Sequence, residues 1–283
     1  MYFETSDGTS LYYEDHGNKA GKPLFLLHGW GISSVFFSEQ IPVLVEKGYR
    51  VITWDWRGHG QSKNQWNGTF KNISSKEELL ELMYDDFKAL KAHLEIDAPY
   101  GIIGHSAGAG VGLSIALANP EEVAILVILN SSYVLAETLT ERTAWQFIPL
   151  ALEASFNPIV QIPYKIALRS TIPLLSLALN RPAKKVKMWI DDFLNVKKRT
   201  VLDEITNLKQ HNLFNELPRL QIPCLIIAGQ LDLLTPPRRA RVLHAHIPHS
   251  ELHIIRNTGH LAMVERPTEV NKYLLDFLKR AYL

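Results

Sequence analysis

The chain has 283 residues, of which 46% are apolar and 21% are charged, as in an ordinary globular protein. Its net charge of +1 provides no field for nucleic acid, so we expect no nucleic-acid partner. The single cysteine, Cys224, excludes an intramolecular disulfide and fits a reducing compartment. No signal-peptide pattern and no apolar stretch of membrane-spanning length is found. We therefore expect a cytoplasmic protein without an integral membrane segment.

Short apolar runs bounded by turn residues predict strands, and longer amphipathic runs predict helices. Asp7-Gly8 predicts a hairpin near the N-terminus, and a capping box of Ser75 and Glu78 begins the longest predicted helix. Strands are predicted at residues 2–4, 10–16, 23–27, 50–54, 99–103, 123–129, 223–228 and 252–255, and helices at 34–46, 75–94, 107–119, 237–246 and 267–278.

Strands that alternate with helices predict a parallel sheet with helices on both faces. The stretch from about Ser132 to Leu217 breaks this alternation. It contains helix-like patterns separated by prolines and no convincing strand. We interpret it as a helical insertion between two strands of the sheet.

The segment Gly-His-Ser-Ala-Gly at residues 104–108 is the most informative motif of the chain. An apolar run at residues 99–103 precedes it, and a small-residue helix follows. This order predicts a strand, a tight turn and a helix, with Ser106 exposed at the apex of the turn. Small residues two positions before and after the serine permit a positive φ there. The alternative is an ordinary serine N-cap.

Together with residues 28–31, residues 55–62, Asp232 and His260, this motif resembles the pattern of the α/β-hydrolase fold family. The resemblance implies a mostly parallel eight-stranded sheet with helices on both faces. It divides the chain into a core of residues 1–132 and 218–283 and a helical cap insertion of residues 133–217. The cap is the part about which the resemblance says least.

The resemblance implies a Ser-His-Asp triad, which we expect to consist of Ser106, His260 and Asp232. A serine hydroxyl is a poor nucleophile unless a base accepts its proton. Among eleven histidines, only His260 follows the last predicted strand in a glycine loop. Asp232 directly follows residues 223–228, and the order Ser, Asp, His is that of this fold. The alternatives are a surface loop histidine and an aspartate in an Asx turn.

In the same family pattern, backbone N–H groups of Trp30 and Ala107 would form an oxyanion hole. Arg57 and His59 of residues 55–62 are expected to shape the neighbouring loop, and not to react. His28 and His105 flank the motifs and are also expected to be structural, although His105 is a candidate for the pocket wall. The further pocket candidates are Trp30, Trp145, Phe147 and Trp189.

Two other clusters suggest sites but have simpler interpretations. His244, His246, His249 and His253 lack a helical spacing and further ligands that would complete a tetrahedral site, so we predict no metal and no cofactor. The lysines and arginine at 184, 185, 187 and 197–199 are interpreted as a solvated basic face.

The leading hypothesis is a serine hydrolase that cleaves small carboxylic esters with a hydrophobic acyl or aryl group. The same triad would serve carbon–carbon bond, lactone or amide hydrolysis, or peracid formation, so these alternatives stay open. A serine at position 106 disfavours relatives with an aspartate nucleophile, namely haloalkane dehalogenases and epoxide hydrolases. Alternatives from other classes are a slow-turnover ligand receptor or scaffold, a lyase and a cofactor-independent oxygenase. The oligomeric state is left open.

Overall fold

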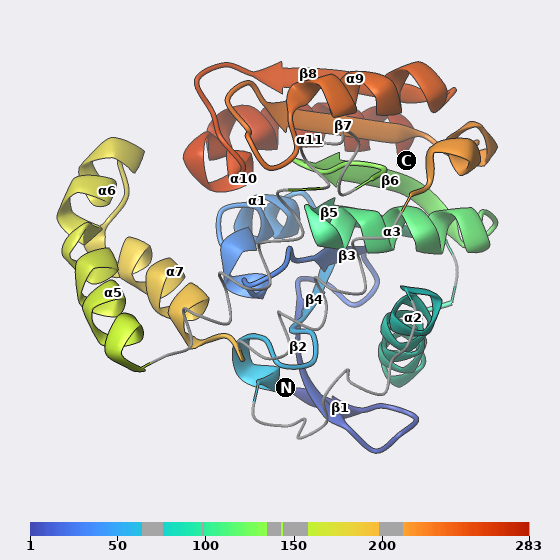
Figure 1. The fold of residues 1–283 in the computed structure, drawn as a ribbon. Coiled ribbons are helices and arrows are strands. Elements are labelled where there is room, and N and C mark those ends of the chain that lie inside the picture. Colours follow the sequence, from blue (N-terminus) through green and yellow to red (C-terminus); the bar gives the residue numbers. More distant parts are fainter. Residues whose placement is uncertain (64–75, 98, 135–142, 144–157, 198–211, 283) are drawn as a thin grey trace.

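The computed structural model describes the chain except for residues 64–75, 98, 135–142, 144–157, 198–211 and 283. Within the described part, eight strands form one sheet in the order β1-β2-β4-β3-β5-β6-β7-β8 (Figure 1). β1 and β2 pair antiparallel to each other, β2 pairs antiparallel to β4, and the remaining pairs are parallel. The strands are β1 (Tyr2–Glu4), β2 (Ser10–His16), β3 (Pro23–Leu27), β4 (Arg50–Trp54), β5 (Tyr100–His105), β6 (Val123–Leu129), β7 (Cys224–Gly229) and β8 (Ser250–Ile255).

This architecture confirms the predicted fold class, and every predicted strand is present within two residues of its predicted bounds. β5 extends to His105, so the strand runs directly into the turn that carries Ser106. Cys224 begins β7 and is fully buried as a free cysteine.

Helices cover both faces of the sheet (Figure 1). On one face lie α2 (Lys76–His93), α3 (Ala107–Ala118) and α9 (Pro237–His246), and on the other lie α1 (Ile41–Glu46) and α11 (Pro267–Ala281). One helix prediction is wrong: residues 34–46 form a short 3₁₀ helix, η1 (Ser34–Phe37), and then α1. Pro42 explains the break, because proline is tolerated in the first turn of a helix and not in its interior. Ser75 of the predicted capping box lies outside the described residues.

Each face of the sheet packs against its own hydrophobic core because side chains alternate along a strand. In β3, Phe25 and Leu27 belong to the core beneath α2, α3 and α9, whereas Leu24 and Leu26 belong to the core beneath α1 and α11. All four side chains have no exposed surface. The two cores hold the parallel strands in register, and so their carboxyl ends line up at one edge.

Three described helices lie between β6 and β7: α5 (Pro158–Ser170), α6 (Ile172–Leu179) and α7 (Ala183–Asn195). α7 packs against η1, and α5 and α6 pack against α7 and against each other, to one side of the sheet (Figure 1). α7 buries one apolar face, whereas α6 has no buried residue. No helix in the described part of the chain has the length and apolar character needed to cross a bilayer.

Candidate active site

Ser106 occupies a strained turn between β5 and α3, with φ 51° and ψ −119°. Two glycines allow this turn to pack closely. A Cβ on Gly104 would lie 2.4 Å from the Cα of Ala109, and one on Gly108 would lie 2.3 Å from the carbonyl oxygen of Leu27. Both neighbours are backbone atoms, which cannot turn aside as a side chain can. The small residues of the motif therefore serve backbone contact around the serine.

Ser106, His260 and Asp232 come together at the carboxyl edge of the sheet. The Nε2 atom of His260 lies 2.9 Å from the Oγ of Ser106, and its Nδ1 lies 2.8 Å from the Oδ2 of Asp232. Ser106 follows β5, Asp232 follows β7 and His260 follows β8, so three parallel strands deliver the three side chains. With Nδ1 protonated, the imidazole donates to Asp232 and leaves Nε2 to accept the serine proton.

The Asp232 carboxylate is almost fully buried and accepts several hydrogen bonds besides that of His260. Its Oδ1 accepts from the backbone N–H groups of Leu234 and Thr235, and its Oδ2 accepts from the Thr235 hydroxyl at 2.6 Å. Burial alone would raise the pKa of Asp232. The bonds from His260 and Thr235 outweigh burial and hold that pKa at about 2. The carboxylate therefore stays ionised beside the imidazole.

Asn130 is a site residue that sequence reasoning missed. It follows β6 with φ 46°, and its Nδ2 donates to Asp232 Oδ2 at 2.9 Å and to the Gly259 carbonyl at 3.0 Å. Asparagine is one of the residue types that adopt positive φ most readily. In the sequence Asn130 is only a polar residue directly after the apolar run at residues 123–129, and nothing there indicates its distant partners. Asn130 ties the loop of His260 to the carboxylate that orients it.

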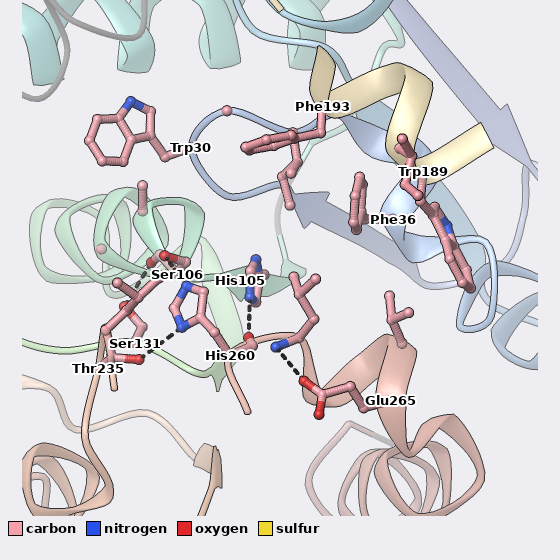
Figure 2. A pocket seen from close by; sticks show the side chains of 18 of the residues that line it. Trp30, Phe36, His105, Ser106, Ser131, Trp189, Phe193, Thr235, His260 and Glu265 are labelled. Atoms are coloured by element: carbon pink, nitrogen blue, oxygen red, sulfur yellow. Dashed lines mark hydrogen bonds between the residues drawn. The ribbon is translucent and has the colours of Figure 1, made fainter. Parts of the chain in front are cut away.

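Glu265 is a second residue that the sequence did not indicate. Its carboxylate accepts hydrogen bonds from the backbone N–H groups of Gly259 at 2.8 Å and Leu261 at 3.1 Å. These two residues flank His260, so one side chain from α10 (Ala262–Glu265) holds both sides of the imidazole's backbone. Figure 2 shows the Glu265 carboxylate below His260, with a dashed line for a hydrogen bond that it accepts.

The backbone N–H of Ala107 is at the first position of α3, where the helix offers no partner for it. The loop of Trp30 approaches the same place. Gly29 packs against the nucleophile motif, since a Cβ there would lie 2.6 Å from His105 Nδ1 and 3.2 Å from Ser106 Cβ. Gly31 adopts φ +70° and donates its N–H to His59 Nε2 at 3.2 Å. Gly29 therefore brings the loop against the serine.

The histidines that flank the motifs are buried and bonded to backbone. His28 Nε2 accepts from the Trp56 N–H at 3.0 Å, and His105 Nε2 donates to the His260 carbonyl at 2.9 Å (Figure 2). Burial lowers the pKa of His28 to about 4 and the pKa values of His59 and His105 to about 3. These rings stay neutral at physiological pH, which fits their predicted structural role.

Residues 55–62 hold the loop that contains Trp30 in place. Asp55 accepts from the N–H and the hydroxyl of Ser34 and from the N–H of Gln61. Arg57 forms a buried pair with Asp86, with Nε and Nη2 donating to the two carboxylate oxygens at 2.8 and 2.7 Å. A bidentate pair of this kind fixes orientation as well as charge.

A cavity of about 810 Å³ opens above Ser106 and His260. This volume is in the range of pockets for small organic ligands. Phe193, Phe36 and Trp189 lie on one side of it, and Ser106, Ser131 and Thr235 on the other (Figure 2). Among the described lining residues there is no lysine or arginine, and Glu265 is the one carboxylate.

The structure places three of the five pocket candidates at this cavity: Trp30, His105 and Trp189. Trp145 and Phe147 lie outside the described residues. Further lining residues from the inserted helices are Tyr164, Leu168, Leu175, Leu179, Val186, Ile190 and Phe193.

Three of the four histidines at positions 244, 246, 249 and 253 have contacts away from the cavity. His244 Nδ1 lies 2.9 Å from the Ser250 hydroxyl, His246 Nδ1 lies 2.9 Å from the Val242 carbonyl, and the His253 ring stacks on Tyr273.

Comparison with known proteins identifies the family. Residues 22–267 match the profile of the alpha/beta hydrolase fold. The chain belongs to the α/β-hydrolase fold family. The resemblance found in the sequence is thereby confirmed. AB hydrolase superfamily protein YisY of Bacillus subtilis strain 168 is 25% identical over 281 residues, which is 98% of each chain.

Solved structures of this family superpose on nearly the whole chain. A hydrolase from Pseudomonas aeruginosa PA01 gives a TM-score of 0.80 at 25% identity, over 98% of this chain and 97% of that one. The enol-lactonase from Burkholderia xenovorans LB400 gives a TM-score of 0.79 at 21% identity, over 99% of this chain and 100% of that one, a likeness of fold.

Proposed function

We propose that this protein is a serine hydrolase of small neutral carboxylic esters with a hydrophobic acyl or aryl group. The observation that carries the proposal is the continuous hydrogen-bond chain from Ser106 through His260 to Asp232. A nucleophile, a base and an orienting carboxylate in this arrangement support acyl transfer. The buried site of Asp232 supports its role as the partner of the imidazolium.

The proposed reaction begins when His260 Nε2 accepts the Ser106 proton and Oγ attacks the ester carbonyl. The N–H groups of Trp30 and Ala107 hold the oxyanion, and the His260 imidazolium returns the proton to the departing alcohol. A water molecule, deprotonated by His260, then cleaves the acyl-enzyme and regenerates the serine. Asp232 stays ionised throughout, and it stabilises the imidazolium in both halves of the reaction.

The wall of the cavity supports the proposed substrate class. The apolar side chains of the wall suit a hydrophobic acyl or aryl group. The cavity itself is large enough for both the acyl and the alcohol part of a small ester. Without a lysine or arginine among the described lining residues, a substrate carboxylate would lie unpaired near Glu265. Neutral esters are therefore favoured over substrates with a free carboxylate.

We also propose that residues 133–217 form a cap over the cavity and that the protein acts in the cytoplasm. Support for the cap comes from α5, α6 and α7, all three of which contribute side chains to the cavity wall. The free, buried thiol of Cys224 supports a reducing compartment.

The test is to treat the wild type and Ser106→Ala with a fluorophosphonate probe and compare their intact masses. We expect one adduct on the wild type and none on the variant. Turnover is then measured with a chain-length series of neutral aryl esters, and with analogues that carry a free carboxylate as controls. The turnover of Ser106→Ala should be several orders of magnitude below that of the wild type, since the triad acts as a unit. Ester hydrolysis that survives in Ser106→Ala would overturn the mechanism. A folded wild type without an adduct would favour a ligand-binding protein.

A further inference from the structure

Residues 30–34 form the loop that would present the Trp30 N–H to substrate, and three side chains from two separate segments hold it. The N–H of Gly31 donates to His59 and that of Ser34 donates to Asp55, both from residues 55–62. Between them, Ser33 is held from the inserted helices. Its N–H donates to Asp192 Oδ2 at 2.9 Å, and its hydroxyl donates to Asp192 Oδ1 at 2.7 Å.

Asp192 is a carboxylate of α7 that reaches across 159 sequence positions to this loop. Ser33 has no exposed surface, so its N–H and hydroxyl have no water in place of Asp192. Both carboxylate oxygens are used, one for each donor, which fixes the direction of the loop as well as its distance from α7. Loss of the carboxylate would leave two buried donors without their acceptor.

α7 is itself fixed against the segment that follows the loop. The Trp189 indole N–H donates to the Val35 carbonyl at 3.3 Å, and Arg181 and Lys185 pair with Glu39 at 2.8 and 2.9 Å. The helix that carries Asp192 is thus held along η1, and in Figure 1 it lies between the core and the α5–α6 pair. A displacement of α7 would be transmitted to Ser33.

We infer that Asp192 is a positioning residue, whose carboxylate holds the loop so that the Trp30 N–H points at the developing oxyanion. This inference rests on the proposed function. The link from Ser33 to the Trp30 N–H is short, because Ser33 is three residues from Trp30 and Gly31 between them is already fixed by His59. The inserted helices would therefore contribute to the chemical step as well as to the cavity wall.

The test compares Asp192→Asn with Asp191→Asn. Asp191 is the adjacent residue of α7, and in the described part of the chain its carboxylate pairs with Arg169 and Lys187, both of the inserted helices. An asparagine offers one acceptor where Ser33 needs two. We expect kcat of Asp192→Asn to fall on the order of tenfold with KM within twofold, since a misdirected oxyanion donor weakens the transition state and not substrate binding. Affinity for an alkylboronic acid, which forms a tetrahedral adduct with serine, should fall in parallel.

Asp191→Asn should match the wild type in all three quantities. Equal kcat and equal boronic acid affinity in the two variants, with an active wild type, would overturn the role of Asp192 and leave the proposed function intact. A wild type that neither hydrolyses esters nor takes up the fluorophosphonate would overturn both. Should Asp192→Asn fail to fold, Ser33→Ala removes the hydroxyl bond to Asp192, together with the 3.5 Å N-cap contact from the Val35 N–H, and keeps the bond from the Ser33 N–H. Its kcat should fall about threefold with KM unchanged. An unchanged kcat there would also count against the inference.

Discussion

The carboxyl edge of the sheet and the α5–α6 pair differ in how completely their side chains are used. At the sheet edge, Asp232 and Ser33 are buried, and each takes part in several hydrogen bonds that fix its position. On α6, by contrast, Leu174 and Leu177 are 68% and 80% exposed. Backbone geometry and buried hydrogen bonds fix the candidate catalytic side chains at the sheet edge. α5 and α6, in contrast, contribute side chains to the cavity wall.

α7 lies between these two regions in both position and character. It buries Trp189 and Leu194 against the core, and its Asp192 accepts hydrogen bonds from Ser33 in the loop at residues 30–34. The inserted segment therefore does not behave as one unit in its contacts: one helix is bound to the core, and the other two are bound to that helix.

After Ser106→Ala, the largest loss of activity is expected from Gly108→Ala, which would break the close contact at the sheet edge. The new Cβ would lie 2.3 Å from the Leu27 carbonyl oxygen and 2.4 Å from that of His28. Either the turn that carries Ser106 or the end of β3 must move. We expect a loss of about 1–3 kcal/mol in the free energy of unfolding. We also expect a fall of about 10² in kcat/KM, because a 1 Å shift of a reacting group costs this much.

Urea denaturation and aryl ester kinetics would measure these two quantities. Ser114→Ala, on the same helix, removes only a hydroxyl that is bonded to the Gly110 carbonyl and should stay within about 0.5 kcal/mol of the wild type. A Gly108→Ala variant with full activity would show that the turn that carries Ser106 does not need the contact with the end of β3.

The residues of this edge divide into those that local sequence predicts and those that it does not. The strands were predictable because apolar runs and turn residues are local signals. The resemblance to the family pattern indicated Ser106, Asp232 and His260, and the structure brings these three side chains together. Asn130 and Asp192 were not predictable, since each acts on a residue more than 100 positions away in the chain. Contacts of that span depend on how the strands and α7 pack.

A second test of the sheet edge is Glu265→Gln. The carboxylate accepts from both N–H groups that flank His260, whereas a glutamine offers one acceptor oxygen and turns an NH₂ toward the second donor. We expect kcat to fall about tenfold, because the imidazole is then less well oriented toward Ser106. Glu269→Gln, an exposed residue of α11, is the control and should leave kcat unchanged. Equal rates in the two variants would mean that His260 needs no support from α10.

The link between α7 and the sheet edge should depend on pH. Burial raises the pKa of Asp192 to about 6, against the hydrogen bonds from Ser33 and with the nearby Asp55 adding to the shift and Lys63 opposing it. The two-acceptor contact needs the ionised carboxylate, so it is present above that pKa and is lost as the pH falls through it. The kcat ratio of wild type to Asp192→Asn should therefore be about tenfold at pH 8 and approach one near pH 5.

Any pH dependence of catalysis that both proteins share cancels in this ratio. Asp232 also drops out, because its pKa of about 2 keeps it ionised over the whole range. The ratio of wild type to Asp191→Asn should be flat from pH 5 to pH 8. A wild type to Asp192→Asn ratio that stayed constant with pH would show that ionisation of Asp192 has no part in holding Ser33.

The smallest effect is expected on α6, from Leu177→Gln. Since 80% of this side chain is already exposed, its replacement removes little buried apolar area from the folded protein. The free energy of unfolding should therefore change by less than about 0.5 kcal/mol. Leu194→Ala on α7 is the matched contrast. That side chain is buried against the core, and its truncation should cost about 2–5 kcal/mol. Urea denaturation of both variants would compare the two helices directly. If Leu177→Gln proved as costly as Leu194→Ala, α6 would be covered by something in solution, and the contrast between the outer helices and the sheet edge would not hold.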